Sequence, residues 1–478
     1  MNVLTPPRLR KFAAVSAALL LPSSFCHAQG SLTPPPGAPA ATMKTLDQVE
    51  ARTPVNATTC PGDAISTFII SQPGSYYFTS HLTSAAGKNG ITITASNVTL
   101  DLNGFTFTGS TVIPQGGIGR SGISAPGNVL KCAVRNGTIT SCGGVGLDMP
   151  FISAKVSDLT ITACGSAADA ATGGLKVHGL VEHCRCVNNG GYGFVGDFGA
   201  VFHDCLAESN GQDGYTLGYG CTLRDCTASG NGFAGFTGLG DTVLSGCVAH
   251  TNATGFAVRG TMSHCLAFNS KGDGFKVSGN LSHCSAKGNG TSGTGDGIDA
   301  NATATLTDCD AANNADLGIR TVDDCTLKNC SAVSNGDGGI TAGQRCQITG
   351  CTASGNGTGA LGTGILTGIR GTVSQCQTMN NRADGISVGG DSVVSACHSS
   401  ANGVGANAAG IRTPGGGCRI EGNATRDNIG TGILATATDI IIRNSSGGNT
   451  SAQYNPGSGA NFAPIQTPAA QTNPNANN

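Results

Sequence analysis

The chain has 478 residues, of which 75 are glycine, none is tryptophan and only 11% are charged. Its formal net charge of −2, without any basic run that contains aromatic residues, gives no electrostatic basis for binding nucleic acid or an anionic membrane surface. So much glycine favours tight turns and short strands over helices, because glycine tolerates positive φ. One elongated repeat domain therefore explains the chain better than three globular domains.

The N-terminus has the pattern of a secretory signal peptide. A positive region is formed by Arg8, Arg10 and Lys11, and an apolar run follows at Phe12–Leu21. The segment Cys26-His27-Ala28 then places small residues where a signal peptidase requires them. The apolar run is too short to be a stable membrane anchor, so we expect cleavage after Ala28. The mature protein is then predicted to be exported to the periplasm, the cell surface or the medium, without membrane insertion.

Three further segments follow from composition. Residues 29–58, which include TPPPGAPA, are predicted to form a flexible leader. The ordered domain is predicted to cover residues 59–450, and it begins with alternating apolar residues in GITITASNVTLDLNGFTFTG that indicate strands of wider coils. The Asn-, Pro-, Ala- and Gln-rich residues 451–478 are predicted to form a disordered tail.

The central part of the sequence repeats about every 21 residues, which is typical of a solenoid. In each unit an apolar residue is followed by a Cys, a small residue, an Asn, and finally a Gly with an apolar residue. The Cys position is occupied by Cys184, Cys205, Cys226, Cys247, Cys265, Cys284, Cys309, Cys330, Cys351, Cys376 and Cys397, and then by Asn423 and Asn444. The Asn position is occupied by Asn189, Asn210, Asn231, Asn252, Asn289, Asn314, Asn335, Asn356, Asn381, Asn402, Asn428 and Asn449, with Ser270 as the one gap.

Each unit predicts three short strands. In the unit from Cys221 to Phe236, inward and outward residues alternate three times, with bends between the runs. Strands of successive units stacked in parallel make an all-β solenoid, a parallel β-helix. Longer units contain extra residues at Thr291–Gly295, Thr358–Gly362 and Val404–Ala408, always between the Asn and the Gly, so these insertions should emerge on one edge.

The repeated Asn predicts a ladder inside a bend, where each buried amide donates to the next coil and accepts from the previous one. The repeated Cys leaves two alternatives for the 20 cysteines that follow the predicted cleavage site. Export favours disulfides. In-register parallel strands, however, hold Cβ atoms about 4.8 Å apart, beyond the roughly 3.5–4.5 Å of a relaxed disulfide. We favour buried thiols. No spacing of zinc-ligand type or cofactor motif is present.

The segment NVTLDLNGFTFTG, followed by repeats such as CTASGN and CSAVSN, resembles the right-handed parallel β-helix proteins of the pectin-lyase-like superfamily. It is most similar to exported bacterial β-helix repeat proteins of uncharacterised function. The resemblance covers about residues 60–450 and implies a right-handed β-helix. It implies no single activity, since this fold is found in lyases, hydrolases, epimerases, adhesins and structural proteins.

Motifs of the enzymatic members are mostly missing. The Asn-Thr-Asp and Gly-His-Gly of polygalacturonase-like enzymes and the Asp-Pro-His-Glu of alginate-epimerase-like enzymes do not occur. Asp323 and Asp324 form an Asp-Asp pair, but at a predicted bend, where acidic residues are ordinary. The resemblance therefore points to no assembled catalytic site.

One outward column remains as a candidate catalytic site. The residue before each repeat Cys should stack at one-coil spacing, and this column contains His183, Asp204, Asp225, Gly246, His264, His283, Asp308 and Asn329. Two histidines near an aspartate could bind a metal or share a proton. The alternative, which we favour, is an exposed bend that selects polar residues; no metal or cofactor is predicted.

Two other sets of charged residues are interpreted as structural. Each of four aspartates directly precedes a turn glycine and is read as a turn residue: Asp213, Asp273, Asp296 and Asp384. Three arginines follow apolar residues assigned to the third strand and could line a groove for a polyanion, although spaced arginines are usually solvated: Arg320, Arg370 and Arg412.

Two functions are therefore kept. The first is a non-catalytic, monomeric exported protein that binds a polysaccharide or cell-surface glycan or has a surface or structural role. The alternative is a polysaccharide lyase or glycoside hydrolase that acts on an acidic polysaccharide through an unrecognised site on the coil surface. Self-assembly through an exposed end of the solenoid is a third hypothesis.

Overall fold

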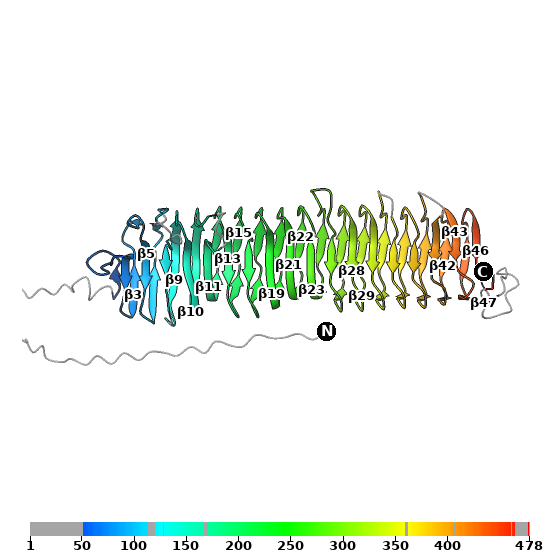
Figure 1. The fold of residues 1–478 in the computed structure, drawn as a ribbon, viewed down its shortest axis with the longest axis horizontal. Helices are drawn as coiled ribbons and strands as arrows, with labels where there is room; N and C mark the ends of the chain where they lie inside the picture. Colours follow the sequence, from blue (N-terminus) through cyan, green and yellow to red (C-terminus); the bar gives the residue numbers. More distant parts are fainter. Residues whose placement is uncertain are drawn as a thin grey trace, which may run out of the picture. The chain divides into compact units, whose positions relative to one another are not determined.

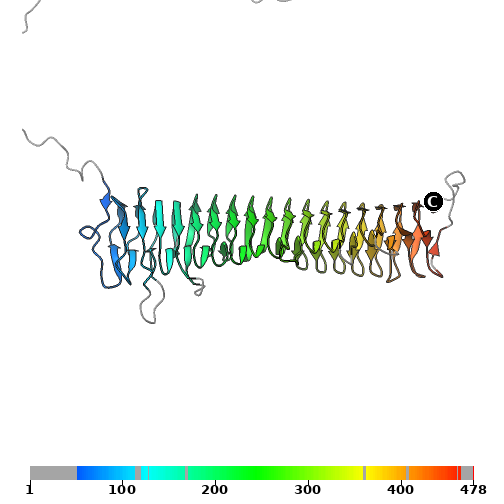
Figure 2. The same cartoon turned by 90° about the horizontal axis from the view of Figure 1, so that it is seen from above.

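The computed structural model describes residues 51–112, 120–127, 129–166, 171–358, 362–404, 408–459, 461–463 and 477. The predicted signal peptide and most of the predicted leader lie outside these residues. From Arg52 onward the chain forms one unit, in which coils stack in sequence order from blue to red (Figure 1). Figure 2 shows the same succession of coils after a turn of 90°. The described residues contain no helix long and apolar enough to cross a membrane.

Each regular coil contributes one strand to each of three faces, here called sheets a, b and c. Sheet a alone contains β1 (Thr53–Pro54), β3 (Gly74–Tyr77), β6 (Val98–Asp101), β14 (Val201–His203), β17 (Thr222–Arg224), β26 (Thr305–Thr307), β29 (Thr326–Lys328), β32 (Gln347–Thr349), β35 (Thr372–Ser374), β38 (Val393–Ser395), β41 (Arg419–Glu421), β44 (Ile440–Ile442) and β47 (Asn461–Phe462).

Sheet b follows sheet a in each coil. It alone contains β4 (Leu82–Thr83), β7 (Thr106–Thr108), β12 (Arg185–Val187), β15 (Leu206–Glu208), β18 (Thr227–Ser229), β20 (Val248–His250), β22 (Leu266–Phe268), β24 (Ser285–Lys287), β27 (Asp310–Ala312), β30 (Ser331–Val333), β33 (Thr352–Ser354), β36 (Gln377–Met379), β39 (His398–Ser400), β42 (Ala424–Arg426) and β45 (Ser445–Gly447).

Sheet c completes the coil. It alone contains β2 (Ser66–Ile70), β5 (Asn89–Ile93), β8 (Ile123–Ser124), β13 (Tyr192–Gly196), β16 (Tyr215–Leu217), β25 (Ile298–Ala300), β28 (Leu317–Thr321), β31 (Gly338–Ala342), β34 (Ile365–Thr367), β37 (Ile386–Val388), β40 (Ala408–Arg412), β43 (Gly430–Leu434) and β46 (Ala452–Asn455). Six longer strands bend from one sheet into the next: β9 (Ala133–Thr140), β10 (Val145–Thr162), β11 (Gly173–Glu182), β19 (Ala234–Ser245), β21 (Thr254–Ser263) and β23 (Phe275–Ser282).

The strands pair in parallel with the equivalent strand one coil away, as the repeat predicts. Thr222 of β17 lies opposite Val243 of β19, and Leu223 lies opposite Leu244. Apart from register shifts between Met149 and Ser153 of β10 and between Gly238 and Thr242 of β19, the register is kept, so each position of the repeat forms a column along the stack. The parallel β-helix inferred from the sequence is therefore confirmed.

Two corners of each coil have a left-handed backbone. In the coil around β17 and β18, Asp225 (φ 53°) links sheets a and b, and Gly230 (φ 61°) links sheets b and c. Positive φ is costly for most side chains and is best tolerated by glycine, asparagine, aspartate and histidine. The many Gly, Asn, Asp and His residues at these corners agree with this backbone.

The interior is a set of stacked columns. Sheet c contributes an aromatic column whose adjacent rings lie 4.7–4.8 Å apart and within 8° of parallel, formed by Phe194, Tyr215, Phe236, Phe256 and Phe275. Sheets a and b contribute columns of branched residues and of alanines, such as Leu223 and Ala228, both fully buried. Each ring therefore packs on its neighbour at the spacing that the strands impose.

The asparagine ladder is present. Oδ1 of Asn231 accepts bonds from both the backbone N–H (3.0 Å) and Nδ2 (2.9 Å) of Asn210, one coil earlier. The same Nδ2 of Asn210 also donates to the carbonyl of Cys186, at 3.0 Å. Buried amides are thus satisfied inside the bend between sheets b and c. At the gap, the buried hydroxyl of Ser270 has no hydrogen-bond partner among the described residues.

The 20 cysteines that the structure describes are all buried free thiols, the alternative that the strand spacing favours. In the cysteine column each thiol group is close to the corner between sheets a and b. For example, Sγ of Cys226 donates to the carbonyl of Arg224, two residues earlier, at 3.3 Å. Cys226, Cys247 and Cys265 illustrate the column, and each is at most 1% exposed. Cysteine fits because it is small, apolar and still offers a weak donor to that carbonyl.

The column at the cysteine position continues past residue 450. Where asparagine replaces cysteine, Nδ2 of Asn423 donates to Oδ1 of Asn444 at 3.0 Å. Oδ1 of Asn477 then accepts from the backbone N–H of Asn444 at 2.9 Å, while its Nδ2 donates to the carbonyl of Ile441 at 3.1 Å. Within the predicted tail, β46 and β47 still add strands, and Asn477 supplies a last rung. Of the three insertions, the fully described one lies between Asn289 and β25, as predicted.

Candidate functional site

The predicted His/Asp column occupies the corners between sheets a and b. All six candidates have φ between 51° and 54°, the left-handed region: His183, Asp204, Asp225, His264, His283 and Asp308. The backbone therefore accounts for the choice of residue types in this column, which is the interpretation that we favoured from the sequence.

The structure brings some of these side chains together, but only on the surface. Nδ1 of His183 lies 3.6 Å from Oδ1 of Asp158, and its Nε2 lies 3.9 Å from Oδ2 of Asp204. Farther along, the rings of His264 and His283 stack at 4.9 Å. About half of the His183 side chain remains exposed, at 53%. In the described part of the chain, no group of three or more His, Cys, Asp or Glu side chains is arranged to hold a metal ion.

The sheet-c face carries a different cluster. Its outward column reads, from one coil to the next, Val195, Thr216, Thr237, Ala257, Lys276, Asp299, Arg320 and Thr341. Two hollows on this face share Lys276. We call them the polar hollow, of about 360 Å³, and the aromatic hollow, of about 350 Å³, and together the sheet-c groove.

The polar hollow is built by three consecutive coils. Asp273 and Lys276 come from one coil, Asp296 and Asp299 from the next, and Arg320 from the third. Oδ1 of Asp273 accepts the N–H of Asp296 at 2.9 Å, and Oδ1 of Asp296 accepts the N–H of Leu317 at 3.0 Å. These two aspartates thus accept hydrogen bonds from the backbone of the following coil, and both line the hollow.

Burial changes the acidity of this cluster. Asp296 is only 5% exposed, and burial, with help from the charges of Asp273 and Asp299, raises its pKa to about 6. Arg320 opposes this shift, because its guanidinium lies 3.5 Å from Oδ2 of Asp296. Burial also raises the pKa of Asp299, which Arg320 approaches to 3.7 Å. A carboxyl group that titrates near pH 6 can hold or release a proton under mild conditions.

The aromatic hollow lies beside the polar one. It is lined by Tyr219, Leu239, Arg259, Lys276 and Asn301, among others. Outside the core, the ring of Tyr219 stacks on that of Phe198 at 6.0 Å and 10°, and the two residues remain 54% and 65% exposed. The two stacked rings form a contiguous exposed apolar surface, which can serve to bind a ligand.

Short coils create this hollow. Cys247 and Cys265 are 18 positions apart, against 21 in most coils, in part because Arg259 alone lies opposite Leu239–Asp241 of β19 where β21 passes from sheet c into sheet a. At the bend, Gly260 has φ 145° and a Cβ there would lie 2.0 Å from the Thr242 carbonyl oxygen. Other coils have loops at Tyr219 and Asn301, and these two residues form opposite sides of the aromatic hollow.

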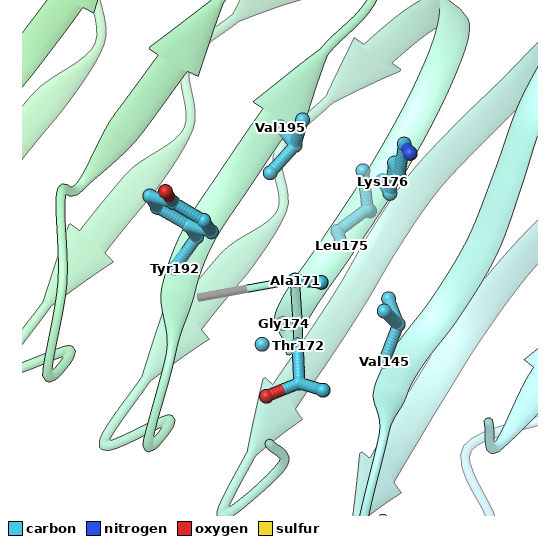
Figure 3. A pocket seen from close by; sticks show the side chains of 9 residues that line it. Val145, Ala171, Thr172, Gly174, Leu175, Lys176, Tyr192 and Val195 are labelled. Carbon is cyan, nitrogen blue, oxygen red and sulfur yellow. The ribbon is translucent and has the colours of Figure 1, made fainter. Parts of the chain in front are cut away.

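Another cavity, near β11 and β13, is too small for a ligand. It encloses about 10 Å³ and is lined by residues that include Val145, Thr172, Leu175, Tyr192 and Val195 (Figure 3). A volume of about 10–15 Å³ holds no more than one water molecule.

Sequence reasoning did not single out Tyr219, Arg259, Lys276 or Asp299. The available signal was the shortened spacing between repeats. Of the three arginines expected in the third strand, Arg320 and Arg412 lie there; Nε of Arg412 is 2.7 Å from Oδ2 of Asp384. Arg370 does not: it follows β34 at a left-handed turn, with φ 59°, because the apolar residue before it belongs to that turn.

Among solved structures, the A-module of the mannuronan C-5 epimerase AlgE4 from Azotobacter vinelandii is 14% identical, with a TM-score of 0.32, over 68% of this chain and 86% of that one. The periplasmic alginate epimerase AlgG is 12% identical, with a TM-score of 0.30, over 74% of this chain and 78% of that one. Tailspike protein 3 of bacteriophage CBA120 is 12% identical, with a TM-score of 0.29, over 82% and 60%. None of these similarities assigns an activity. No curated protein matches the sequence.

The family described as "right handed beta helix region" matches residues 89–248 and 239–368, which together span more than half of the chain. The parallel pairing, the three sheets and the asparagine ladder agree with that match. The chain belongs to the family of right-handed β-helix proteins.

Proposed function

We propose that this protein is an exported glycan-binding β-helix whose ligand lies in the sheet-c groove. The observation that carries the proposal is the combination of an exposed aromatic pair, Phe198 and Tyr219, with a hollow lined by polar side chains. Glycans present both apolar ring faces and hydroxyl groups, so a binding site needs both kinds of surface. The signal-peptide pattern at the N-terminus supports export.

The groove is also suited to a chain rather than a single small molecule. The two hollows are contiguous at Lys276 and together extend over several coils of the stack. Coil-by-coil stacking repeats the same outward positions, so successive sugar units meet successive side chains.

Binding to a panel of soluble polysaccharides, measured by isothermal titration calorimetry, tests this proposal. We expect Tyr219→Ala to weaken binding about fivefold, since a stacked ring contributes on the order of 1 kcal/mol. Phe233→Ala is the matched control, because it removes a ring that is 55% exposed and does not line the groove. Failure of every polysaccharide to bind, or equal losses in the two variants, contradicts the proposal.

Hydrolysis of the bound glycan is a second candidate function, favoured by one observation. Asp296 is a buried carboxyl whose raised pKa, about 6, suits a general acid, and Asp299 and Asp273 supply carboxylates nearby. In such a pair, the acid protonates the glycosidic oxygen and the carboxylate activates water or attacks the sugar. The His/Asp column also lines a hollow, of about 330 Å³, at His183, Asp204 and Asp225, but each of these side chains is more than half exposed.

This activity is tested by release of reducing ends from any glycan that binds. If Asp296 is the acid, Asp296→Asn abolishes release while binding persists. Release by the unmodified protein then falls as the pH rises through about 6, because the acid must carry its proton. Unchanged release by Asp296→Asn excludes this role; the absence of release by the unmodified protein leaves the binding function alone.

A further inference from the structure

Sheet b carries a hollow that belongs neither to the sheet-c groove nor to the His/Asp column. It encloses about 430 Å³, its surface is mostly apolar, and it is lined by Leu266, Phe268, Asn269, Lys287, Gly288 and Asn313. None of these residues lines the other hollows described above. Its volume lies within the range of ligand pockets, roughly 300–1,000 Å³.

A short stack of rings ends at this hollow, which we call the sheet-b hollow. In one outward column of sheet b, His250 is followed from coil to coil by Phe268, Lys287 and Ala312. The rings of His250 and Phe268 stack at 4.9 Å and 12°. Nδ1 of His250 also lies 3.3 Å from Oγ of Ser229, in the preceding coil. One face of the Phe268 ring is therefore covered by a ring that is itself held in place.

The other face of the Phe268 ring is turned toward the coil of Lys287, where the column has no further ring. Lysine has a flexible four-carbon stem, and Ala312 in the coil beyond is small. At the neighbouring corner, Gly288 has φ 62° and no side chain. Because parallel strands lie about 4.8 Å apart, the space beside Phe268 has the depth of one more stacked ring.

The ammonium group of Lys287 is available to a ligand. Its side chain is exposed, and no ion pair in the described part of the chain involves it. The carboxyl group of the next strand, that of Asp310, lies opposite Ser285 in the other outward column of sheet b and forms no ion pair with Lys287. The side-chain amides of Asn269 and Asn313 also line the hollow, and neither makes a hydrogen bond within the described residues. The sheet-b hollow thus combines a free ring face with a positive charge and two amide groups.

We infer that the sheet-b hollow binds a small planar aromatic carboxylate, whose ring stacks on Phe268 and whose carboxylate pairs with Lys287. The ring of the ligand extends the stack of His250 and Phe268 by one member. The ammonium group supplies a point charge to the carboxylate, and amide N–H groups of Asn269 and Asn313 are donors for its oxygens. This site does not depend on the proposed glycan binding, because it shares no lining residue with the sheet-c groove.

Three matched compounds test this ligand class with the full-length mature protein in equilibrium dialysis. They are 2-naphthoate, the neutral 2-naphthamide, and decahydro-2-naphthoate, which keeps the charge but has no flat ring. We expect 2-naphthoate to bind about fivefold more tightly than its decahydro form, because only the flat ring stacks on Phe268. It should bind about threefold more tightly than the amide, because an exposed ion pair contributes little more. Added salt should reduce the second preference and leave the first.

Variants locate the binding. Phe268→Leu keeps an apolar side chain but removes the ring, so it should abolish the preference for 2-naphthoate over its decahydro form. Lys287→Gln should abolish the preference over the amide. The matched controls are Phe233→Leu, which removes an exposed ring outside the hollow, and Lys328→Gln, which removes an exposed charge from sheet a. Both controls should leave binding unchanged, and circular dichroism checks that every variant is folded.

Three results would overturn the inference. The first is the absence of saturable binding of 2-naphthoate at millimolar concentration. The second is equal binding of the three compounds, which would show that the hollow takes up apolar surface of any shape and charge. The third is binding that neither Phe268→Leu nor Lys287→Gln changes, since the ligand then lies elsewhere on the protein. If Phe268→Leu does not fold, Lys287→Gln and the three compounds still decide the question.

Discussion

Removal of one rung of the asparagine ladder should cost much more stability than its size suggests. In Asn335→Ala four hydrogen bonds disappear: two to Oδ1 from Asn314, through its backbone N–H and its Nδ2, and two from Nδ2, to the Ala311 carbonyl and to Oδ1 of Asn356, all at 3.0–3.1 Å. The site is fully buried, at 0% exposure, so water does not replace them. The backbone N–H of Asn314 and the carbonyl of Ala311 lose these bonds, whereas Nδ2 of Asn314 keeps its bond to the Ala286 carbonyl at 3.2 Å.

At roughly 1 kcal/mol for each lost bond, and more where a buried group stays unsatisfied, the free energy of unfolding should fall by about 4 kcal/mol. Urea denaturation followed by circular dichroism measures the loss. Hydrogen exchange at the Asn314 amide localises it, which matters because long repeat arrays need not unfold in a single step.

The control for this measurement is Asn280→Ala, an exposed asparagine on β23. Its substitution should change stability by no more than about 0.5 kcal/mol. A loss below about 1 kcal/mol in Asn335→Ala, or unaltered exchange at Asn314, would refute the view that the ladder stabilises the stack through satisfied buried amides.

Four further predictions follow from the same geometry. Ser270→Asn fills the gap in the ladder and should raise the urea midpoint, by about 1 kcal/mol of stability, since it supplies a partner for neighbouring buried amides; a lower midpoint would show that the gap is sterically required. The pKa of Asp296 is raised on folding to about 6, so the unmodified protein should lose stability as the pH rises from about 4 to 6, and Asp296→Asn should flatten that dependence in urea midpoints measured across this window. His264→Asn/His283→Asn keeps residues that tolerate a left-handed corner and should leave glycan binding and stability unchanged, whereas a loss of binding in titration calorimetry would bring the His/Asp column back as a site. The buried thiols should not react with a thiol reagent until denaturant is added, and rapid labelling of the native protein would contradict their burial.

The repeat made most of the fold predictable, because each coil meets nearly identical neighbours. A residue such as Leu223 or Asn231 therefore has the same environment as its equivalents, and its position in the unit decides whether it lies inside or outside. The polar corner residues follow in the same way, since a left-handed backbone selects them wherever they occur, as at Asp225.

The candidate site could not be predicted in this way, since it depends on where the repeat departs from regularity. Tyr219, Arg259, Lys276 and Asn301 come from different coils and occupy different positions of the unit. They share one hollow because β21 and its neighbour β23 pass directly from sheet c into sheet a, while Tyr219 and Asn301 lie in loops between these sheets in other coils.

Sequence alone thus determined the solenoid, its inward columns and its ladder, because those features repeat and depend on local spacing. Only the tertiary structure decided which irregular residues meet. Asp296 became a buried acid beside Arg320, 24 residues later, and Asn477 became a rung against Asn444, 33 residues earlier. Such contacts arise from the summed lengths of intervening coils and loops, which no single unit of the repeat specifies.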